Sequence, residues 1–186
     1  MRKNLVWIDL EMTGLDLEKM VILEIASIVT NDELDILAEG PEIAIHHPKH
    51  VLANMEEWSR EHHSASGLLD RVMGSNLDSR KAEQITLDFV SVHCGKSESP
   101  LCGNSVWQDR RFLAKYMPNL ESFLHYRVID VSSVKELATR WYPSLPRYEK
   151  KKTHLALDDI RESIEELRYY REKIFNQSLG HEMDLE

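Results

Sequence analysis

The chain has 186 residues, of which 42% are hydrophobic and 30% charged. This composition fits a single globular domain with a sizeable core, and no apolar run approaches the length of a membrane span. The formal net charge of -9 argues against a long, nonspecific grip on duplex nucleic acid, which relies on a broad basic surface, but it is compatible with a short anionic substrate.

The first predicted strand carries two acidic residues. The stretch VWIDLEMTGL, residues 6–15, begins like a buried strand and then places Asp9 and Glu11 at its end. Because strand side chains alternate between faces, these two acids point the same way. Buried like charges need cations or protons to persist, and a divalent metal meets that need. The alternative is that the strand ends at Ile8 and both acids lie in a solvated turn.

Two features bear on the cellular compartment. The N-terminus leads straight into the first strand, without the apolar segment and cleavage site of a secretory signal, so we expect a cytoplasmic protein. Cys94 and Cys102 form no zinc pattern, and we expect both to be reduced structural cysteines.

The remaining elements follow from hydrophobic periodicity and from turn residues. In chain order we predict strands over 21–30 and 36–47, helices over 52–58, 66–73 and 79–93, a short strand over 99–104, a helix from 105 to 117, a strand over 128–131, a helix over 132–143, a mobile basic connection over 146–154 and a last helix over 155–175.

This order predicts an α/β fold. Three strands in antiparallel succession, followed by strands separated by helices, indicate a mixed five-stranded sheet flanked by helices on both faces. We expect one domain over residues 1–175 and a loosely ordered tail over 176–186. Ligands of open α/β sheets gather at the C-terminal ends of the strands, where Asp9 and Glu11 would lie.

Two more acids and a histidine are candidates for the same site. Asp109 lies on the first turns of a helix after a short strand, although its more ordinary role is a surface acid paired with Arg110 or another base. In HLALDDIRESIEEL the helical repeat places Asp159 beside the apolar stripe and turns Asp158 toward solvent. His154 precedes this helix on a loop that could reach the site, although a lone loop histidine more often faces solvent.

Together these five residues, in their order and local context, resemble the DEDD-type 3′-to-5′ exonucleases with a catalytic histidine, and most closely the oligoribonucleases. A single D-x-E pattern is weak, but five matching blocks spread over nearly the whole chain are specific. The blocks are WIDLEMTGL, MEEWSREHHSASGL, GNSVWQDRRFL, HYRVIDVSSVKEL and HLALDDIRESIEELRYYRE. The resemblance implies a ribonuclease H-like fold, a cytoplasmic homodimer and 5′-mononucleotide products released from the 3′ end.

The resemblance also implies a two-metal site. Four carboxylates would hold two Mg²⁺ or Mn²⁺ ions, which prefer oxygen ligands. Asp9 is expected to bridge both ions, and Glu11 and Asp159 to hold the one beside the nucleophile. Asp109 would act on the second ion, in part through water. Neutral His154 would take the proton from the attacking water, since histidine titrates near working pH.

Seven further residues are implied in substrate binding. They are Leu15 and Trp58 against the bases, His63 near the substrate, Ser105 and Ser132 near its 5′ phosphate, and Tyr126 and Arg127 from the partner subunit. Stacking tolerates different bases, and donors around a terminal phosphate favour a substrate about two nucleotides long. The ordinary alternatives are core packing for the Leu15 and Trp58 side chains, a helix cap for Ser105 and a mere dimer contact for the last two.

Trp107 departs from the pattern, because a smaller residue is expected there in relatives. Its indole points either into the core or into the pocket wall near Ser105.

The leading hypothesis is therefore an exoribonuclease for very short RNA, including dinucleotides. A general or proofreading exonuclease would use the same acids on longer strands. An α/β module that only binds nucleic acid or protein is the third hypothesis, and the complete acid and histidine set disfavours it.

Overall fold

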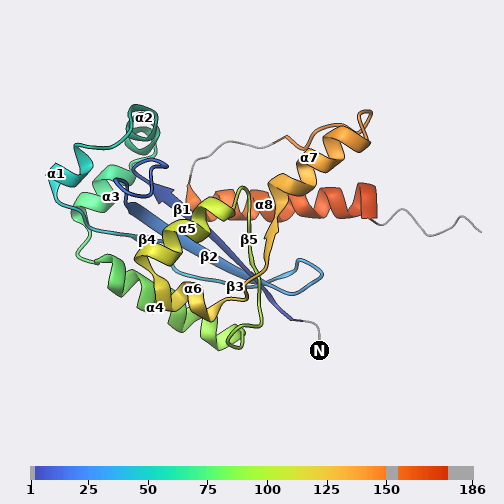
Figure 1. Cartoon of the computed structure of the whole chain (residues 1–186), viewed down its shortest axis with the longest axis horizontal. Coiled ribbons are helices and arrows are strands. Elements are labelled where there is room, and N and C mark those ends of the chain that lie inside the picture. The colour runs from blue at the N-terminus through green and yellow to red at the C-terminus, as the bar shows by residue number, and fades with distance from the viewer. Residues whose placement is uncertain (1–2, 150–154, 176–186) are drawn as a thin grey trace, which may run out of the picture.

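The computed structural model describes residues 3–149 and 155–175, and its centre is a mixed sheet (Figure 1). The six strands are β1 (Leu5–Met12), β2 (Ile22–Thr30), β3 (Ile36–Glu39), β4 (Ile43–Ala44), β5 (Leu101–Gly103) and β6 (Val128–Asp130). Their order is β3-β2-β1-β5-β6, with β4 also beside β2. The pairs within the first four strands are antiparallel, whereas β1–β5 and β5–β6 are parallel. The predicted mixed α/β sheet is confirmed.

The sheet has six strands instead of the predicted five, because residues 36–47 form two short strands. Gly40 and Pro41 separate β3 from β4. Proline has no N–H for the ladder. The Gly40 N–H donates to the Ser27 carbonyl at 2.8 Å, and a Cβ on Gly40 would overlap the Ser27 hydroxyl. The close approach of this turn to β2 therefore needs glycine, and Pro41 ends the strand.

The described residues also form eight α-helices and one π-helical turn. They are α1 (Lys49–Leu52), α2 (Glu57–Ala65), α3 (Leu68–Gly74), α4 (Ser79–His93), α5 (Trp107–Tyr116), α6 (Pro118–Phe123), α7 (Val131–Trp141), α8 (Ala156–Tyr170) and η1 (Arg171–Phe175). The bounds predicted for α4 are confirmed, since Asp78 caps its first turn by accepting from the Lys81 N–H at 2.8 Å. The helices predicted near 66–73, 105–117 and 132–143 are confirmed with small shifts at their ends.

The helix predicted over 52–58 is wrong. The chain leaves α1 after Leu52, and the Glu56 N–H donates to the Thr13 carbonyl at 2.9 Å before α2 begins. This tertiary hydrogen bond holds the intervening residues out of a helix. The predicted last helix is α8 followed by the π-helical turn, and α6 was not predicted.

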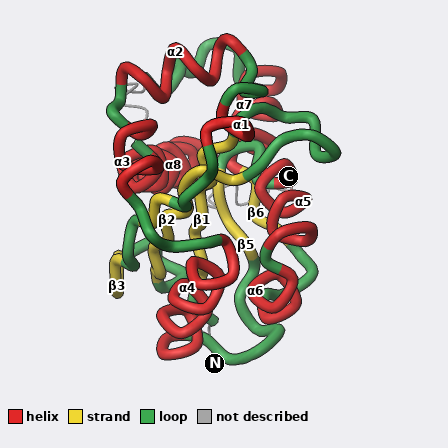
Figure 2. Tube along the Cα trace, turned by 90° about the vertical axis from the view of Figure 1, so that its left-hand side faces the viewer, coloured by secondary structure: helices red, strands yellow, loops and turns green. Residues whose placement is uncertain are grey.

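The two faces of the sheet pack against different helices. On one face Val6, Ile8 and Leu10 contact residues of α4, α5 and α6, and on the other Leu5 and Trp7 contact residues of α7 and α8. Figure 2 shows the strands lying between α8 and α5. The alternation of side chains along β1 therefore aims its odd-numbered residues at α8.

Some predictions concern residues that the structure does not describe. The predicted tail over 176–186 and residues 150–154 of the basic connection lie outside the described residues. Within residues 3–149 and 155–175, no helix combines the length and the apolar character needed to cross a bilayer. Cys94 and Cys102 are both free thiols, and burial raises the pKa of each.

Candidate active site

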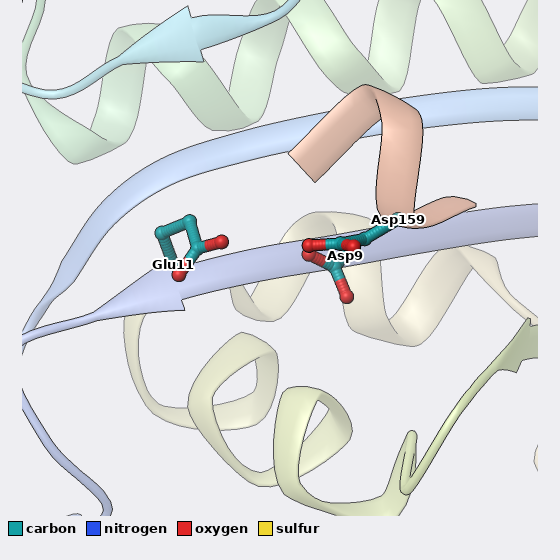
Figure 3. A group of neighbouring side chains, drawn as sticks. All are labelled: Asp9, Glu11 and Asp159. Carbon is teal, nitrogen blue, oxygen red and sulfur yellow. The ribbon is translucent and has the colours of Figure 1, made fainter. Parts of the chain in front are cut away.

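Three carboxylates meet near the C-terminal end of β1. Asp9 and Glu11 share the face of β1 that packs against α8, and Asp159 lies in the first turn of α8 (Figure 3). One oxygen atom from each carboxylate lies within 4.8 Å of the other two. We call these residues the acidic triad. The turn predicted as an alternative for Asp9 and Glu11 is wrong, because β1 continues to Met12.

The two neighbouring acids at the start of α8 face different surroundings. Asp159 joins the acidic triad, whereas an oxygen of Asp158 lies 2.7 Å from the Arg161 guanidinium. The same guanidinium contacts Glu39 of β3 at 2.7 Å. This surface ion-pair network orients Asp158 away from the triad and fixes α8 against the edge of the sheet.

The electrostatics of the acidic triad fit a bound cation. The Glu11 side chain is only 19% exposed. Burial, followed by the charges of Asp159, Glu24 and Asp109, raises the pKa of Glu11 to about 8. A protein without metal would therefore hold a proton on Glu11 near neutral pH, and a divalent cation can take its place. The donors are all carboxylate oxygens, the ligands preferred by Mg²⁺ and Mn²⁺.

Glu24 is a functional candidate that the sequence analysis missed. It lies directly opposite Glu11 in the β1–β2 register and is fully buried. Arg71 of α3 forms an ion pair with Glu24 and lies 3.6 Å from Glu42. Burial raises the pKa of Glu24 to about 7, although the positive charge of Arg71 opposes the shift. A single acid in the apolar run VILEIASIVT was the available signal, the same kind of signal that identified Asp9.

Asp109 occupies the wall next to the acidic triad. It is buried, and its Oδ1 accepts a hydrogen bond from the Leu10 N–H at 3.0 Å. β5 pairs with β1 only at Val6 and Trp7, so a side chain replaces the missing strand partner of Leu10. Burial raises the pKa of Asp109.

The structure thus gathers three of the four predicted acids into one cluster and places the fourth beside it. The surface role considered for Asp109 is wrong, because its side chain is buried and Arg110 instead binds Glu121 and the His125 carbonyl.

Two bays adjoin the acidic triad. The first, about 480 Å³, is lined by Glu11, Trp58 and His63 among others, and we call it the Trp58 bay. The second, about 340 Å³, is lined by Asp9, Asn104, Ser105, Trp107 and Asp109 among others, and we call it the Trp107 bay. Leu10, Met12 and Leu15 line both bays, which therefore meet at these three side chains.

Three large apolar side chains around the bays are exposed. Leu15 is 54% exposed, Trp58 63% and Trp107 52%. The alternative of core packing is therefore wrong for Leu15 and Trp58, and the core orientation considered for Trp107 is wrong as well. The Trp58 ring stacks on the His62 ring with centroids 3.8 Å apart.

His63 contacts the acidic triad from α2. Its Nε2 lies 2.9 Å from the Met12 carbonyl oxygen, and its Nδ1 lies 3.7 Å from an oxygen of Glu11. Burial lowers the pKa of His63, which favours a neutral ring. A neutral ring that donates from Nε2 to the carbonyl presents an unprotonated Nδ1 to Glu11.

Ser105, which lines the Trp107 bay, contacts Ser132. Their hydroxyl oxygens lie 3.2 Å apart, and the Ser105 N–H donates to both the Asp130 carboxylate and the Ser132 hydroxyl at 3.0 Å. These contacts hold Ser105 at a φ of 51°, in the left-handed region. Ser105 does not cap α5, whose N-cap is Val106. The hydroxyls are instead grouped at one point of the surface.

Three predicted site residues remain, namely Tyr126, Arg127 and His154. Tyr126 is 72% exposed, stacks on His125 and has the Arg127 guanidinium 5.4 Å from its ring centroid. Among the described residues, neither Tyr126 nor Arg127 lines the Trp58 bay or the Trp107 bay. His154 lies outside the described residues.

Comparisons with known proteins place this geometry in a family. A family model described as an exonuclease matches residues 6–167. The oligoribonuclease of Coxiella burnetii is 57% identical over 176 residues, which cover 94% of this chain and 96% of that protein. The oligoribonuclease of Mannheimia succiniciproducens is 59% identical over 171 residues, which cover 91% of this chain and 92% of that protein.

Solved structures of other proteins share the fold of this chain. Exonuclease I from Methylocaldum szegediense has a TM-score of 0.73 at 15% identity, over 94% of this chain and 41% of that one. E. coli exonuclease I in complex with a 5cy-dT13 oligonucleotide has a TM-score of 0.72 at 12% identity, over 94% and 42%. The chain thus spans about two fifths of each of these larger proteins. The predicted ribonuclease H-like fold is confirmed.

Proposed function

The chain belongs to the oligoribonuclease family of exonucleases, and from this membership we propose that it hydrolyses very short RNA, above all dinucleotides, to 5′-mononucleotides. The enzyme is a 3′-to-5′ exoribonuclease, a hydrolase of phosphodiester bonds. The observation that supports the substrate preference is the acidic triad beside two bays of about 480 and 340 Å³, both within the volume range of pockets for small ligands.

We propose that the acidic triad and Asp109 hold two divalent ions, Mg²⁺ or Mn²⁺. Asp9 lines the same bay as Asp109 and belongs to the triad, which supports its role as the shared ligand. When bound, such ions activate the attacking water and stabilise the leaving oxygen. The raised pKa of Glu11 supports the proposal, because cations remove the repulsion among these carboxylates.

The protein's own residues position the substrate and move the proton. His154, close to Asp159 in sequence, is proposed as the base that takes the proton of the attacking water. His63 is proposed to face the substrate in the Trp58 bay while its bond to Met12 fixes the ring. Trp58 and Leu15 offer apolar surfaces on which a nucleobase can stack, and stacking of this kind accepts all four nucleobases.

A limit on substrate length is proposed at Ser105 and Ser132. Their clustered hydroxyls would donate hydrogen bonds to a terminal 5′ phosphate beside the Trp107 bay, for which Ser132 would turn its hydroxyl proton away from Asn104. We further propose a cytoplasmic homodimer, with residues 1–175 as one exonuclease domain, in which Tyr126 and Arg127 reach the partner's site. Their exposure and their position outside both bays of their own chain support this arrangement.

The test compares initial cleavage rates on 5′-labelled RNAs of two, three, five and ten nucleotides with Mg²⁺. The dinucleotide is expected to be cleaved fastest, and Asp159→Asn is expected to lower every rate at least about a hundredfold. Asp158→Asn is the matched control, since this neighbouring acid pairs with Arg161 at the surface, and its rates should stay within about twofold of wild type.

Equal or faster cleavage of the ten-nucleotide RNA would favour a general exonuclease. Absence of metal-dependent cleavage on all four RNAs would favour a module that only binds.

A further inference from the structure

Trp107 is an exposed indole on the wall of the active site, and nothing in the proposed chemistry uses it. It is the first residue of α5, two positions before the buried Asp109. Trp107 lines the Trp107 bay together with Leu15 and Ser105. Exposing about half of a tryptophan side chain to water is unfavourable, so a surface that covers the ring in the bound state would be favoured.

The Trp107 ring, like the Trp58 ring, contacts the side chain of a residue one turn later on the same helix. Arg111, one helical turn after Trp107, places its guanidinium carbon 5.5 Å from the indole centroid, a cation–π contact. Arg111 is itself fixed by a 2.7 Å hydrogen bond to the Gln108 side chain. In the Trp58 bay, His62 stacks on Trp58 from the equivalent position one turn later. Each bay thus has one indole oriented by a neighbour on its own helix.

Leu15 completes the parallel between the bays. Its exposed side chain lines both, so each bay combines one indole with one shared leucine. A flat ring beside an apolar side chain is a surface on which a nucleobase stacks, and two such surfaces on either side of one leucine match two successive bases. The Trp107 bay also contains Ser105, which we assign to the 5′ phosphate, so its base belongs to the 5′ nucleotide.

We infer that Trp107 is a second stacking platform, which binds the base of the 5′ nucleotide and makes the enzyme prefer a purine there. A purine covers more of the indole than a pyrimidine does, so the contact discriminates by area. This inference rests on the proposed function, because it assumes a dinucleotide substrate. It adds a preference at the 5′ base that the acidic triad and the serines do not supply.

The test measures kcat and KM for four 5′-phosphorylated RNA dinucleotides with adenine or uracil at each position. Trp107→Ala is expected to raise KM about tenfold for a 5′ adenine and only about twofold for a 5′ uracil, while kcat changes less than about twofold. Trp107→Phe should restore most of the adenine preference. Val92→Ala, an exposed apolar residue on α4, is the control and should change neither constant.

The readouts separate this inference from the proposed function. A wild-type protein that cleaves no dinucleotide would overturn both. If wild type cleaves dinucleotides but Trp107→Ala keeps the same ratio of adenine to uracil KM values, the stacking platform alone is wrong. Faster cleavage of five-nucleotide RNA by Trp107→Ala, with that ratio unchanged, would also overturn it and leave the ring as a steric wall. Unchanged circular dichroism spectra would show that the variants fold.

Discussion

At the scale of single residues, Glu11 would couple the stability of the protein to binding of the proposed metal ions. Its pKa rises from 4.5 to about 8 on folding, chiefly because of burial and then because of Asp159, Glu24 and Asp109. The folded state therefore binds a proton on Glu11 more tightly than the unfolded state does. This contribution to stability is present in full below pH 4.5 and is lost as the pH rises through 8.

The metal-free protein is accordingly expected to lose stability, on the order of a few kcal/mol, between pH 5 and pH 8. Glu11→Gln should flatten this dependence and be more stable than wild type at pH 8, since its amide carries no charge. Added Mg²⁺ or Mn²⁺ should raise the melting temperature of wild type more at pH 8 than at pH 6. Urea unfolding in EDTA and in metal would check both, and identical pH profiles for wild type and Glu11→Gln would contradict the role given to Glu11.

The sequence predicted individual side chains well wherever a simple period governs them. The period of two along β1 placed Asp9 and Glu11 together, and the helical period separated Asp159 from Asp158. Glu24 was missed because its strand is covered on both faces, so no alternation marks it. The contact of Asp109 with Leu10 depends on where β5 stops pairing, which no local pattern contains.

At the scale of elements, Asn104 joins the end of β5 to α7 and α8. Its Nδ2 donates to the Ser163 hydroxyl at 2.8 Å and to the Glu166 carboxylate at 3.1 Å, and its Oδ1 accepts from the Ser132 hydroxyl at 3.0 Å. The Ser163 hydroxyl in turn donates to the Asp159 carbonyl at 2.8 Å. This chain of hydrogen bonds fixes the turn of α8 that carries a member of the acidic triad.

Asn104→Ala is expected to destabilise the protein by about 1 to 3 kcal/mol, because Glu166 is buried and loses a donor. It should also raise the Mg²⁺ concentration needed for half-maximal activity several-fold, since Asp159 is held less firmly. Asn119→Ala is the matched control. Asn119 Nδ2 donates to Glu83, and neither residue lines the Trp58 bay or the Trp107 bay, so this variant should lose stability without a change in the Mg²⁺ requirement.

A parallel shift of the Mg²⁺ requirement in both variants would contradict the positioning role of Asn104. Urea denaturation and Mg²⁺ titration of the cleavage rate supply the two measurements.

Elements were predictable where local signals sufficed. α4 has its own capping residue at Asp78 and a clear apolar period, so its bounds were correct. The helix over 52–58 was wrong because the hydrogen bond from Glu56 to Thr13 decided the backbone there. The long strand over 36–47 was wrong because Pro41, which has no N–H, interrupts the pairing with β2. α6 is a single short helix that starts at Pro118 and gives little periodic signal.

At the scale of the whole molecule, the proposed homodimer makes each site depend on two chains. If Tyr126 acts in the partner's site, Tyr126→Ala should lower the cleavage rate without lowering the melting temperature, because the side chain is exposed. Light scattering should give twice the chain mass of 21.7 kDa for both proteins.

A mixture of Asp159→Asn and Tyr126→Ala dimers, exchanged under mild denaturant, is the decisive measurement. A mixed dimer has one site with an intact Asp159 and an intact Tyr126 from the other chain, so up to about half the activity per mixed dimer should return. No recovery despite proven exchange would mean that Tyr126 acts within its own chain or only packs.

The sequence predicted the arrangement of strands and helices but not the two bays beside the acidic triad. The order of strands and helices gave the mixed sheet, because the connections between elements leave few topologies. The two bays could not be predicted, since they form between β1, α2 and α5, segments far apart in the chain.

β1 pairs with β5 only at Val6 and Trp7, which has a further consequence for the Leu10 amide. The Leu10 amide is held by the Asp109 carboxylate and not by a neighbouring strand, so its protection from hydrogen exchange depends on a single ionisable side chain. In a spectrum of isotopically labelled protein, this one backbone signal in the middle of the sheet would follow the charge on Asp109. The backbone amide signal of Leu10 would therefore report the charge of Asp109 in the active site.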